Sequence, residues 1–183
     1  MKAKALIPLV LFLLLAGLFF FTLKKINQGE YNPRHVPSPF IGKQAPAFSI
    51  PDLLQPGKKV DPAAMRGKVW LMNVWGTWCP ECWREHGYLL HLAKDKGVNI
   101  VGVDWRDDPA KGREMIAKLG NPFLMIADDQ AGNVAIDWGV YGAPETFVVD
   151  KQGIIRLKYE GAINEDVWRE RFEPLVRQLE GQP

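Results

Sequence analysis

Both cysteines of this chain lie close together, and their spacing constrains the fold and the chemistry more than any other feature. Residues 78–82 have the sequence WCPEC, which places Cys79 and Cys82 two residues apart. The apolar residues 69–75 before the motif read as a buried strand, and residues 83–94 after it read as a helix. At such a junction, backbone N–H groups and the positive end of the helix dipole stabilise a thiolate, the form of cysteine that attacks disulfides. The motif therefore predicts a thiol–disulfide oxidoreductase.

The two cysteines have different expected roles. Cys79 at the helix N-terminus is the predicted attacking thiol, because this position can lower the pKa of a thiol. Cys82, one turn later on the same face and deeper, is predicted to resolve the mixed disulfide. Pro80 suits the first helical turn, where its missing N–H is not needed. Two unrelated buried cysteines would be the alternative, and they fit this spacing and setting poorly.

The composition speaks against several other classes of protein. Two cysteines cannot form a multi-disulfide scaffold, and a single CxxC lacks the second ligand pair of a four-ligand zinc site. The three histidines are not spaced as a metal motif, so we expect neither a metal site nor a cofactor. A formal net charge of +2 gives no indication of nucleic-acid binding. The 183 residues are enough for one globular domain and an anchor.

An apolar N-terminal segment is the second strong feature. Residues 5–23 carry no charge, and at about 1.5 Å per helical residue they nearly span a hydrocarbon core of about 30 Å. We expect residues 1–25 to be an uncleaved single-pass membrane anchor, and a cleaved signal peptide is the alternative. Lysines flank the segment on both sides, so the positive-inside rule does not fix its orientation. Residues 26–39, rich in proline, are the predicted tether, and residues 40–183 are the predicted domain.

The domain alternates between strand and helix patterns. A hairpin is expected early, across the Pro56-Gly57 turn, and strand–helix–strand segments follow. A second hairpin and a last helix capped by Asn164 close the domain, which predicts an α/β fold with a mixed central sheet. The expected strands are 47–50, 59–61, 69–74, 98–104, 123–127, 146–150 and 154–159, and the helices that follow the Cys79 helix are 109–119, 133–138 and 165–180.

Glu85 is a candidate for proton transfer. It lies three residues after Cys82, near the same helix face. A carboxylate there could accept the proton of Cys82 during resolution, and it would raise the pKa values of the cysteines. The alternative is an ordinary acid at the start of the helix that faces solvent. The sequence does not separate the two.

Two further features flank the dithiol. Ala143 and Pro144 lie just before a predicted strand, and a cis bond between them would make a tight turn that presents backbone groups to an extended peptide. A trans bond would leave a plain loop. Trp78 belongs to an apolar rim that would exclude water and hold a partner chain, with core packing as its alternative. The predicted substrate-binding residues are Trp78, Pro80, Ala143 and Pro144.

Several segments together resemble a known family. WCPEC after an apolar strand, WREH directly after it, GVNIVGVDWRDD at 97–108 and GAPETF at 142–147 are similar to the cytochrome c maturation thiol–disulfide reductases of the DsbE/CcmG type, and the apolar N-terminus agrees with this. The resemblance implies a thioredoxin-like fold with an N-terminal β-hairpin and a central insert. It also implies that Pro144 is a cis-proline, and that the catalytic residues are Cys79, Cys82, Glu85 and Glu145.

The resemblance implies a function as well. The domain would face the periplasm from the inner membrane and receive electrons from a membrane donor of the DsbD type. It would reduce the CxxCH disulfide of apocytochrome c, or a disulfide shared with an apocytochrome-holding maturation protein, and we expect it to be a monomer. Two alternatives stay open: a general periplasmic thiol reductase of the TlpA/ResA kind, and a chaperone that binds Cu(I) through both thiolates. A peroxidase lacks support, because no Thr-x-x-Cys pattern is present.

Overall fold

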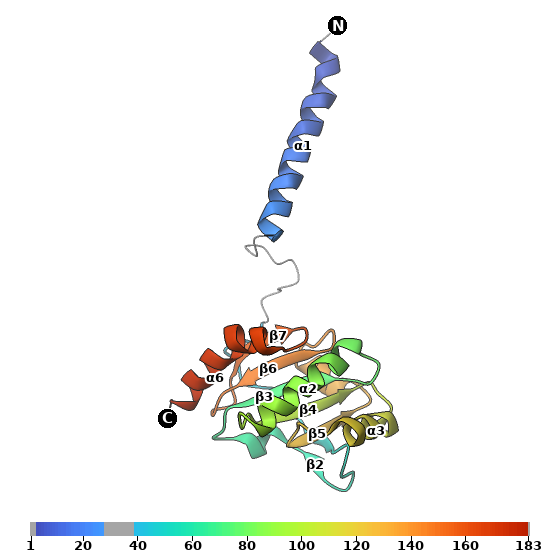
Figure 1. Ribbon diagram of the computed structural model, residues 1–183, viewed down its shortest axis with the longest axis vertical. Helices are drawn as coiled ribbons and strands as arrows, with labels where there is room; N and C mark the ends of the chain where they lie inside the picture. Colours follow the sequence, from blue (N-terminus) through green and yellow to red (C-terminus); the bar gives the residue numbers. More distant parts are fainter. Residues whose placement is uncertain (1–2, 28–38, 183) are drawn as a thin grey trace. The chain divides into compact units, whose positions relative to one another are not determined.

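The computed structural model describes residues 3–27 and 39–182, which belong to two separate compact units. The first unit contains helix α1 (Ala3–Asn27), drawn in blue in Figure 1. Its segment Ile7–Lys24 is long and apolar enough to cross a membrane, judged by length and composition. The helix continues through residue 27 rather than ending at the predicted limit of the anchor, residue 25. Most of the predicted tether, residues 28–38, lies outside the described residues.

A five-stranded mixed sheet forms the centre of the second unit, in the order β5-β4-β3-β6-β7. β4 (Ile100–Trp105) pairs parallel with the central strand β3 (Trp70–Trp75), and β5 (Met125–Asp129) pairs parallel with β4. β6 (Glu145–Val149) pairs antiparallel with β3, and β7 (Ile155–Glu160) pairs antiparallel with β6. Every residue of β3 and β6 is buried, as expected for strands that are covered on both faces. The predicted mixed sheet is therefore confirmed, with strand boundaries moved by one or two residues.

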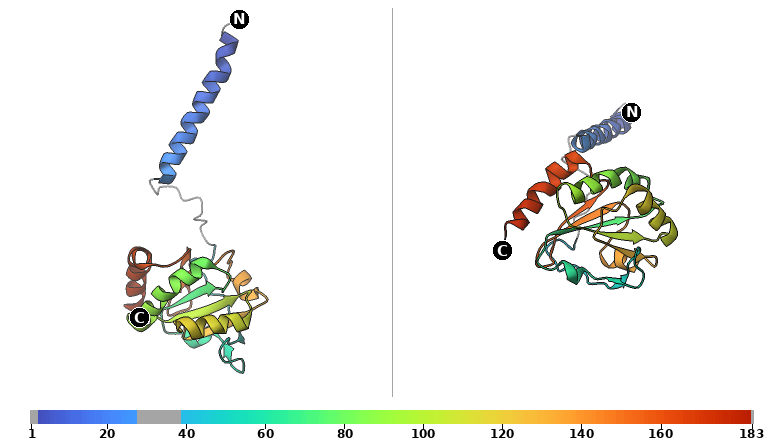
Figure 2. Two further views of the ribbon diagram at one scale, coloured as in Figure 1. Left: turned by 45° about the vertical axis from the view of Figure 1, so that its right-hand side comes forward. Right: turned by 60° about the horizontal axis from the view of Figure 1, so that its bottom comes forward.

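Helices and loops cover both faces of the sheet (Figures 1 and 2). α2 (Pro80–Lys94), α3 (Pro109–Leu119) and the C-terminal helices share one hydrophobic core with the sheet. On the other face, α4 (Asn133–Asp137) and the N-terminal hairpin enclose a second core around Trp138 and Phe147. β5 and α4 follow α3 and precede β6 in the chain.

The N-terminal hairpin is present but shorter than predicted. β1 (Ile50–Pro51) pairs antiparallel with β2 (Lys59–Val60), and the 3₁₀ helix η1 (Pro62–Met65) follows. The chain before β1 is bound elsewhere, since the Ala45 N–H donates to the Gly153 carbonyl at 2.8 Å. β1 begins at Ile50, three residues later than predicted.

The C-terminal helix is interrupted, which corrects the prediction of one continuous helix over 165–180. α5 (Glu165–Val167) leads into a π-helical turn, η2 (Trp168–Phe172), and α6 (Glu173–Glu180) follows. Pro174 has no N–H to donate to the preceding turn. The regular hydrogen-bond pattern therefore breaks just before it, while apolar residues on both sides of the break, Phe172 and Val176 among them, belong to the same hydrophobic core.

Candidate active site

The two cysteines lie at the start of α2 and are joined in a disulfide. Cys79 is the N-cap residue of the helix, and its Sγ accepts the Cys82 N–H at 3.2 Å. Pro80 takes the first helical position, where the sequence places it. Both cysteines are 2% exposed, so the greater depth expected for Cys82 is not found in the disulfide form.

The loop before β6 covers Cys79. The Ala143–Pro144 peptide bond is cis, as predicted. The Ala143 carbonyl oxygen lies 3.3 Å from Cys79 Sγ, and this contact explains why Cys79 is as buried as Cys82. A chain that reaches Cys79 would therefore meet the backbone of this loop.

Glu85 lies inside the domain, which removes the alternative of a solvent-facing acid. Its side chain comes from α2 and is 2% exposed. Oε1 accepts a hydrogen bond from Asn73 Nδ2, and Oε2 accepts one from the Ile163 N–H, both at 2.9 Å. Burial raises the pKa of Glu85 to about 7; the Ile163 and Asn73 donors oppose this rise and the nearby Glu81 charge adds to it. A carboxyl with this pKa is half ionised near neutral pH, as a proton acceptor requires.

Glu145 contacts the covering loop rather than the cysteines. Its Oε1 accepts the N–H groups of Tyr141 and Gly142, each at 3.0 Å, and its Oε2 lies 3.0 Å from Lys158 Nζ. Burial raises the pKa of Glu145, whereas the two N–H donors and Lys158 oppose that rise. These contacts hold the turn that leads to Ala143.

Aromatic side chains border the disulfide as predicted. Trp78 is 49% exposed, and its Nε1 donates to the Trp105 carbonyl at 3.1 Å. Trp83 is also exposed, and its Nε1 donates to the Thr77 carbonyl at 2.9 Å. Trp75, in contrast, is buried in the core, as its position in a strand indicates. The indole hydrogen bonds hold the exposed rings in place beside the start of α2.

Three polar residues that the sequence pattern did not indicate support the site. Asn73 donates to Glu85, and Lys158 pairs with Glu145. Asn73 is a polar residue within an otherwise apolar predicted strand, and this signal could have identified it. Lys158 lies in a predicted strand that also contains Arg156, so the pattern did not single it out. Asp107 accepts hydrogen bonds from the N–H and the hydroxyl of Thr77, two residues before Cys79. Asp107 lies in a loop, so no periodic pattern indicated its partner.

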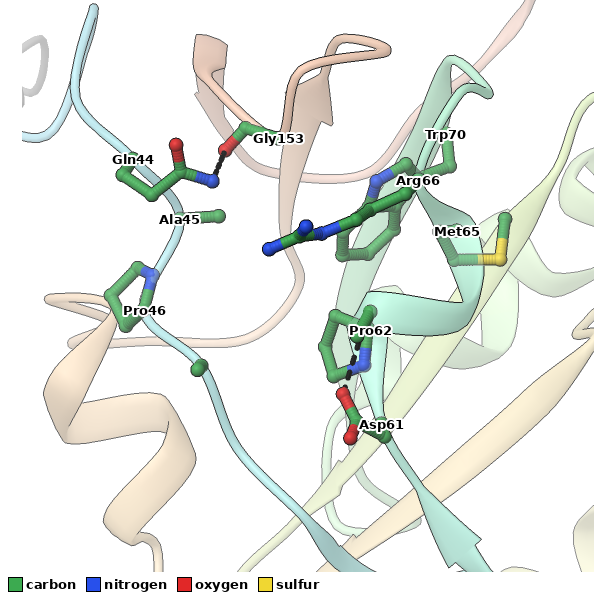
Figure 3. A pocket seen from close by; sticks show the side chains of 11 residues that line it. Gln44, Ala45, Pro46, Asp61, Pro62, Met65, Arg66, Trp70 and Gly153 are labelled. Atoms are coloured by element: carbon green, nitrogen blue, oxygen red, sulfur yellow. Dashed lines mark hydrogen bonds between the residues drawn. The ribbon is translucent and has the colours of Figure 1, made fainter.

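A pocket lies across the sheet from the disulfide, beside the second core. The chain before β1, η1 and β3 enclose it, and Arg66 reaches into it beside Trp70 (Figure 3). It contains neither cysteine, and we assign it no part in the chemistry. Among residues 3–27 and 39–182, no group of three or more His, Cys, Asp or Glu side chains is placed to hold a metal ion.

Comparison with known proteins identifies the family. The family model described as Redoxin matches residues 40–173. The thiol:disulfide interchange protein DsbE of Allochromatium vinosum is 43% identical over 97% of this chain and 95% of its own length. DsbE of Yersinia pestis is 46% identical over 96% of this chain and 93% of its own. This chain belongs to the DsbE family of thiol:disulfide interchange proteins. As a DsbE-family protein with a CxxC disulfide, it is a thiol:disulfide oxidoreductase, which favours the enzyme over the copper chaperone.

Solved structures share the fold of this DsbE-family domain. A putative DsbE from Chlorobium tepidum aligns with a TM-score of 0.66 at 24% identity, over 77% of this chain and 98% of that one. A putative thioredoxin from Neisseria meningitidis aligns with a TM-score of 0.63 at 29% identity, over 75% of this chain and 93% of that one. The predicted thioredoxin-like fold is thereby confirmed.

Proposed function

We propose that this protein is a membrane-anchored reductant of cytochrome c biogenesis. Residues 1–25 would form the anchor in the inner membrane, residues 26–39 the tether, and residues 40–183 the catalytic domain in the periplasm. Helix α1 supports the anchor, because it is long and apolar enough to span a bilayer. The likeness to DsbE proteins over nearly the whole length of both chains supports the family role.

The observation that carries the reducing role is the buried carboxyl of Glu85. It follows Cys82 by three residues on α2, and it accepts the N–H of Ile163, a residue of the core that also contains both cysteines. A carboxylate near a dithiol disfavours both thiolates, so the reduced pair lacks the thiolate stabilisation that makes a dithiol a poor electron donor, and it gives up its electrons more readily. The same carboxylate can accept a proton when Cys82 must become a thiolate.

Reduction proceeds in two exchange steps. In the first, the Cys79 thiolate attacks one sulfur of the substrate disulfide; that S–S bond breaks, a mixed disulfide forms, and the other substrate sulfur leaves as a thiolate. In the second, Cys82 gives its proton to Glu85 and attacks Cys79 Sγ, which releases the remaining substrate thiolate and forms the Cys79–Cys82 disulfide. Two electrons pass to the substrate, and a membrane donor of the DsbD type would return them to the protein.

The substrate would lie along the rim and the covering loop. Trp78, Pro80, Ala143 and Pro144 are the proposed contacts, because they surround Cys79, and Glu145 is proposed to act by holding the loop. The proposed substrate is the CxxCH segment of oxidised apocytochrome c, or a mixed disulfide of that segment with an apocytochrome-holding maturation protein.

The test compares redox potential and substrate preference in one experiment. The full chain in detergent micelles is equilibrated with glutathione buffers, and its reduced form is then offered an oxidised CxxCH peptide or insulin. We expect a reducing potential and reduction of the peptide at least about tenfold faster than of insulin; a tenfold ratio corresponds to about 1.4 kcal/mol in the barrier.

Two outcomes would contradict the proposal. A strongly oxidising potential, toward the value of about −120 mV found for DsbA, would exclude a reducing role. Equal rates with peptide and insulin would instead favour a general periplasmic reductase. The same assay with Cys79→Ser serves as the control, since any remaining reduction would come from a contaminant.

A further inference from the structure

Asp104 is a buried acid that the two exchange steps do not use. It lies near the end of β4 and is 1% exposed. Among the described residues, no N–H or O–H group donates a hydrogen bond to either of its carboxyl oxygens. Burying an ionised carboxylate without hydrogen-bond donors costs on the order of several kcal/mol. A buried acid avoids this cost by keeping its proton.

The groups around Asp104 also favour the protonated form. Asp107 from the following loop and Asp128 from the neighbouring strand β5 are both acidic, and Arg113 from α3 opposes them. Burial, followed by these two acids and a hydrogen bond with Asp107, raises the pKa of Asp104 to about 8. On the α3 side the carboxyl packs directly against Gly112, where a Cβ would collide with Asp104 Oδ2. The glycine leaves room for the acid inside the core.

Asp107 connects this buried acid to the loop that carries the attacking cysteine. Its two carboxylate oxygens accept the Thr77 N–H and the Thr77 hydroxyl, the latter at 2.8 Å. Thr77 is followed by Trp78, whose indole donates to the carbonyl of Trp105, next to Asp104. Two contacts therefore tie the segment before Cys79 to the end of β4.

Asp104 and Asp107 interact, and neither carboxylate can donate a hydrogen bond to the other unless one of them keeps a proton. When Asp104 is protonated, its hydroxyl can donate to Asp107, whose remaining lone pairs still accept from Thr77. We propose that Asp104 and Asp107 share this proton, and that Asp104 thereby acts as a positioning residue which holds Thr77 and Trp78 in place in front of Cys79.

Loss of this proton has a defined consequence. Once Asp104 ionises, its carboxylate repels the carboxylate of the half-buried Asp107, and Asp107 moves away or loses its order. The Thr77 hydrogen bonds weaken, and the approach to Cys79 becomes less well defined. The rate of exchange per Cys79 thiolate therefore falls at alkaline pH, although the thiolate fraction itself rises.

The test measures this rate and the order of the loop together. The reduced full chain in micelles reacts with oxidised glutathione from about pH 6 to about pH 9.5, and each rate is divided by the thiolate fraction from ultraviolet absorbance. Hydrogen–deuterium exchange of the peptide that contains Thr77 is followed in the same samples. We expect a severalfold fall in rate per thiolate above about pH 8, near the pKa of Asp104. Over the same range we expect the exchange at Thr77 to become faster relative to its intrinsic rate at each pH.

Three variants separate positioning from packing. Asp104→Asn keeps an N–H donor toward Asp107 at every pH, so the alkaline fall should disappear while any titration of Glu85 near neutral pH remains. Asp104→Leu removes the donor, so Thr77 should exchange fast at all pH values. Asp128→Asn removes a neighbouring charge without touching Thr77, so the fall should remain but move to lower pH.

The proposal is overturned if the wild-type protein shows no alkaline fall, or if Asp104→Asn shows the same fall as the wild type. Either result would mean that Asp104 only fills space beside Gly112. Because Asp104→Asn keeps the size of the side chain, this comparison stays decisive even if Asp104→Leu fails to fold.

Discussion

At the scale of single residues, buried carboxyl groups decide how the domain responds to pH. The pKa of Glu85 is raised to about 7 and that of Asp104 to about 8, whereas both side chains titrate near about 4 in an unfolded chain. Between these values the folded state keeps protons that the unfolded state has released. The free energy of unfolding therefore falls as pH rises from about 4 to about 8, and this contribution levels off at higher pH.

Glu85→Gln should remove one of these two titrations. We expect the loss of unfolding free energy between about pH 5 and about pH 8 to shrink by roughly 1–3 kcal/mol relative to the wild type, measured by urea denaturation. Glu114→Gln changes an exposed acid on α3 and should leave the wild-type loss intact. If Glu85→Gln loses as much stability as the wild type over this range, Glu85 does not hold a proton in the folded state.

The division of roles between the cysteines gives a second prediction at this scale. In Cys82→Ser the attack by Cys79 still occurs but resolution does not, so a mixed disulfide between Cys79 and the substrate peptide should accumulate. Cys79→Ser should form no such adduct. Non-reducing electrophoresis and mass spectrometry measure both. An adduct through Cys82 in Cys79→Ser would reverse the assigned roles.

At the scale of elements, the sequence predicts what depends on local pattern and misses what depends on distant contacts. The spacing of apolar residues predicts the strand before Cys79 and the helix after it, and a capping residue predicts the helix start at Asn164. All three are present. The burial of Glu85 depends on Ile163, which is distant in sequence but adjacent in the fold. No local pattern separates that arrangement from an acid that faces solvent, so the sequence alone is compatible with both interpretations.

The cap of α5 links an element to the site. Asn164 Oδ1 accepts the Val167 N–H at 2.9 Å, and the preceding residue, Ile163, donates its N–H to Glu85. Asn164→Ala should lower the free energy of unfolding by about 1 kcal/mol through loss of the cap. It should also weaken the Ile163 hydrogen bond, which stabilises the carboxylate, and so raise the pKa of Glu85 further.

Urea denaturation and a carboxyl titration by infrared spectroscopy check the two effects of Asn164→Ala separately. Glu170→Ala, an exposed position on the following turn, is the matched control and should change neither quantity. A loss of stability with an unchanged Glu85 titration would show that the cap is energetically separate from the site.

At the scale of the whole molecule, helix α1 and the domain form separate compact units. The domain encloses two hydrophobic cores of its own, one on each face of the sheet, and none of the residues in them belongs to α1. The side chains of 7–24 are exposed, as those of a segment that faces lipid would be. The residues of both cores and both cysteines therefore belong to the domain, and the proposed anchoring would depend on the helix alone.

This separation makes a prediction about truncation. A chain that begins at residue 39 should keep the melting temperature of the domain within about 2 °C, since no core residue is lost. It should also keep the wild-type rate with oxidised glutathione in solution.

In cells that depend on this protein, the truncated chain should leave the membrane fraction and fail to support cytochrome c maturation, because a tethered domain meets membrane-bound partners at a far higher effective concentration. An unrelated apolar helix in place of residues 3–27 should restore maturation. If the truncated chain unfolds, the helix is part of the domain after all; if it supports maturation fully, anchoring is not what the apolar segment contributes.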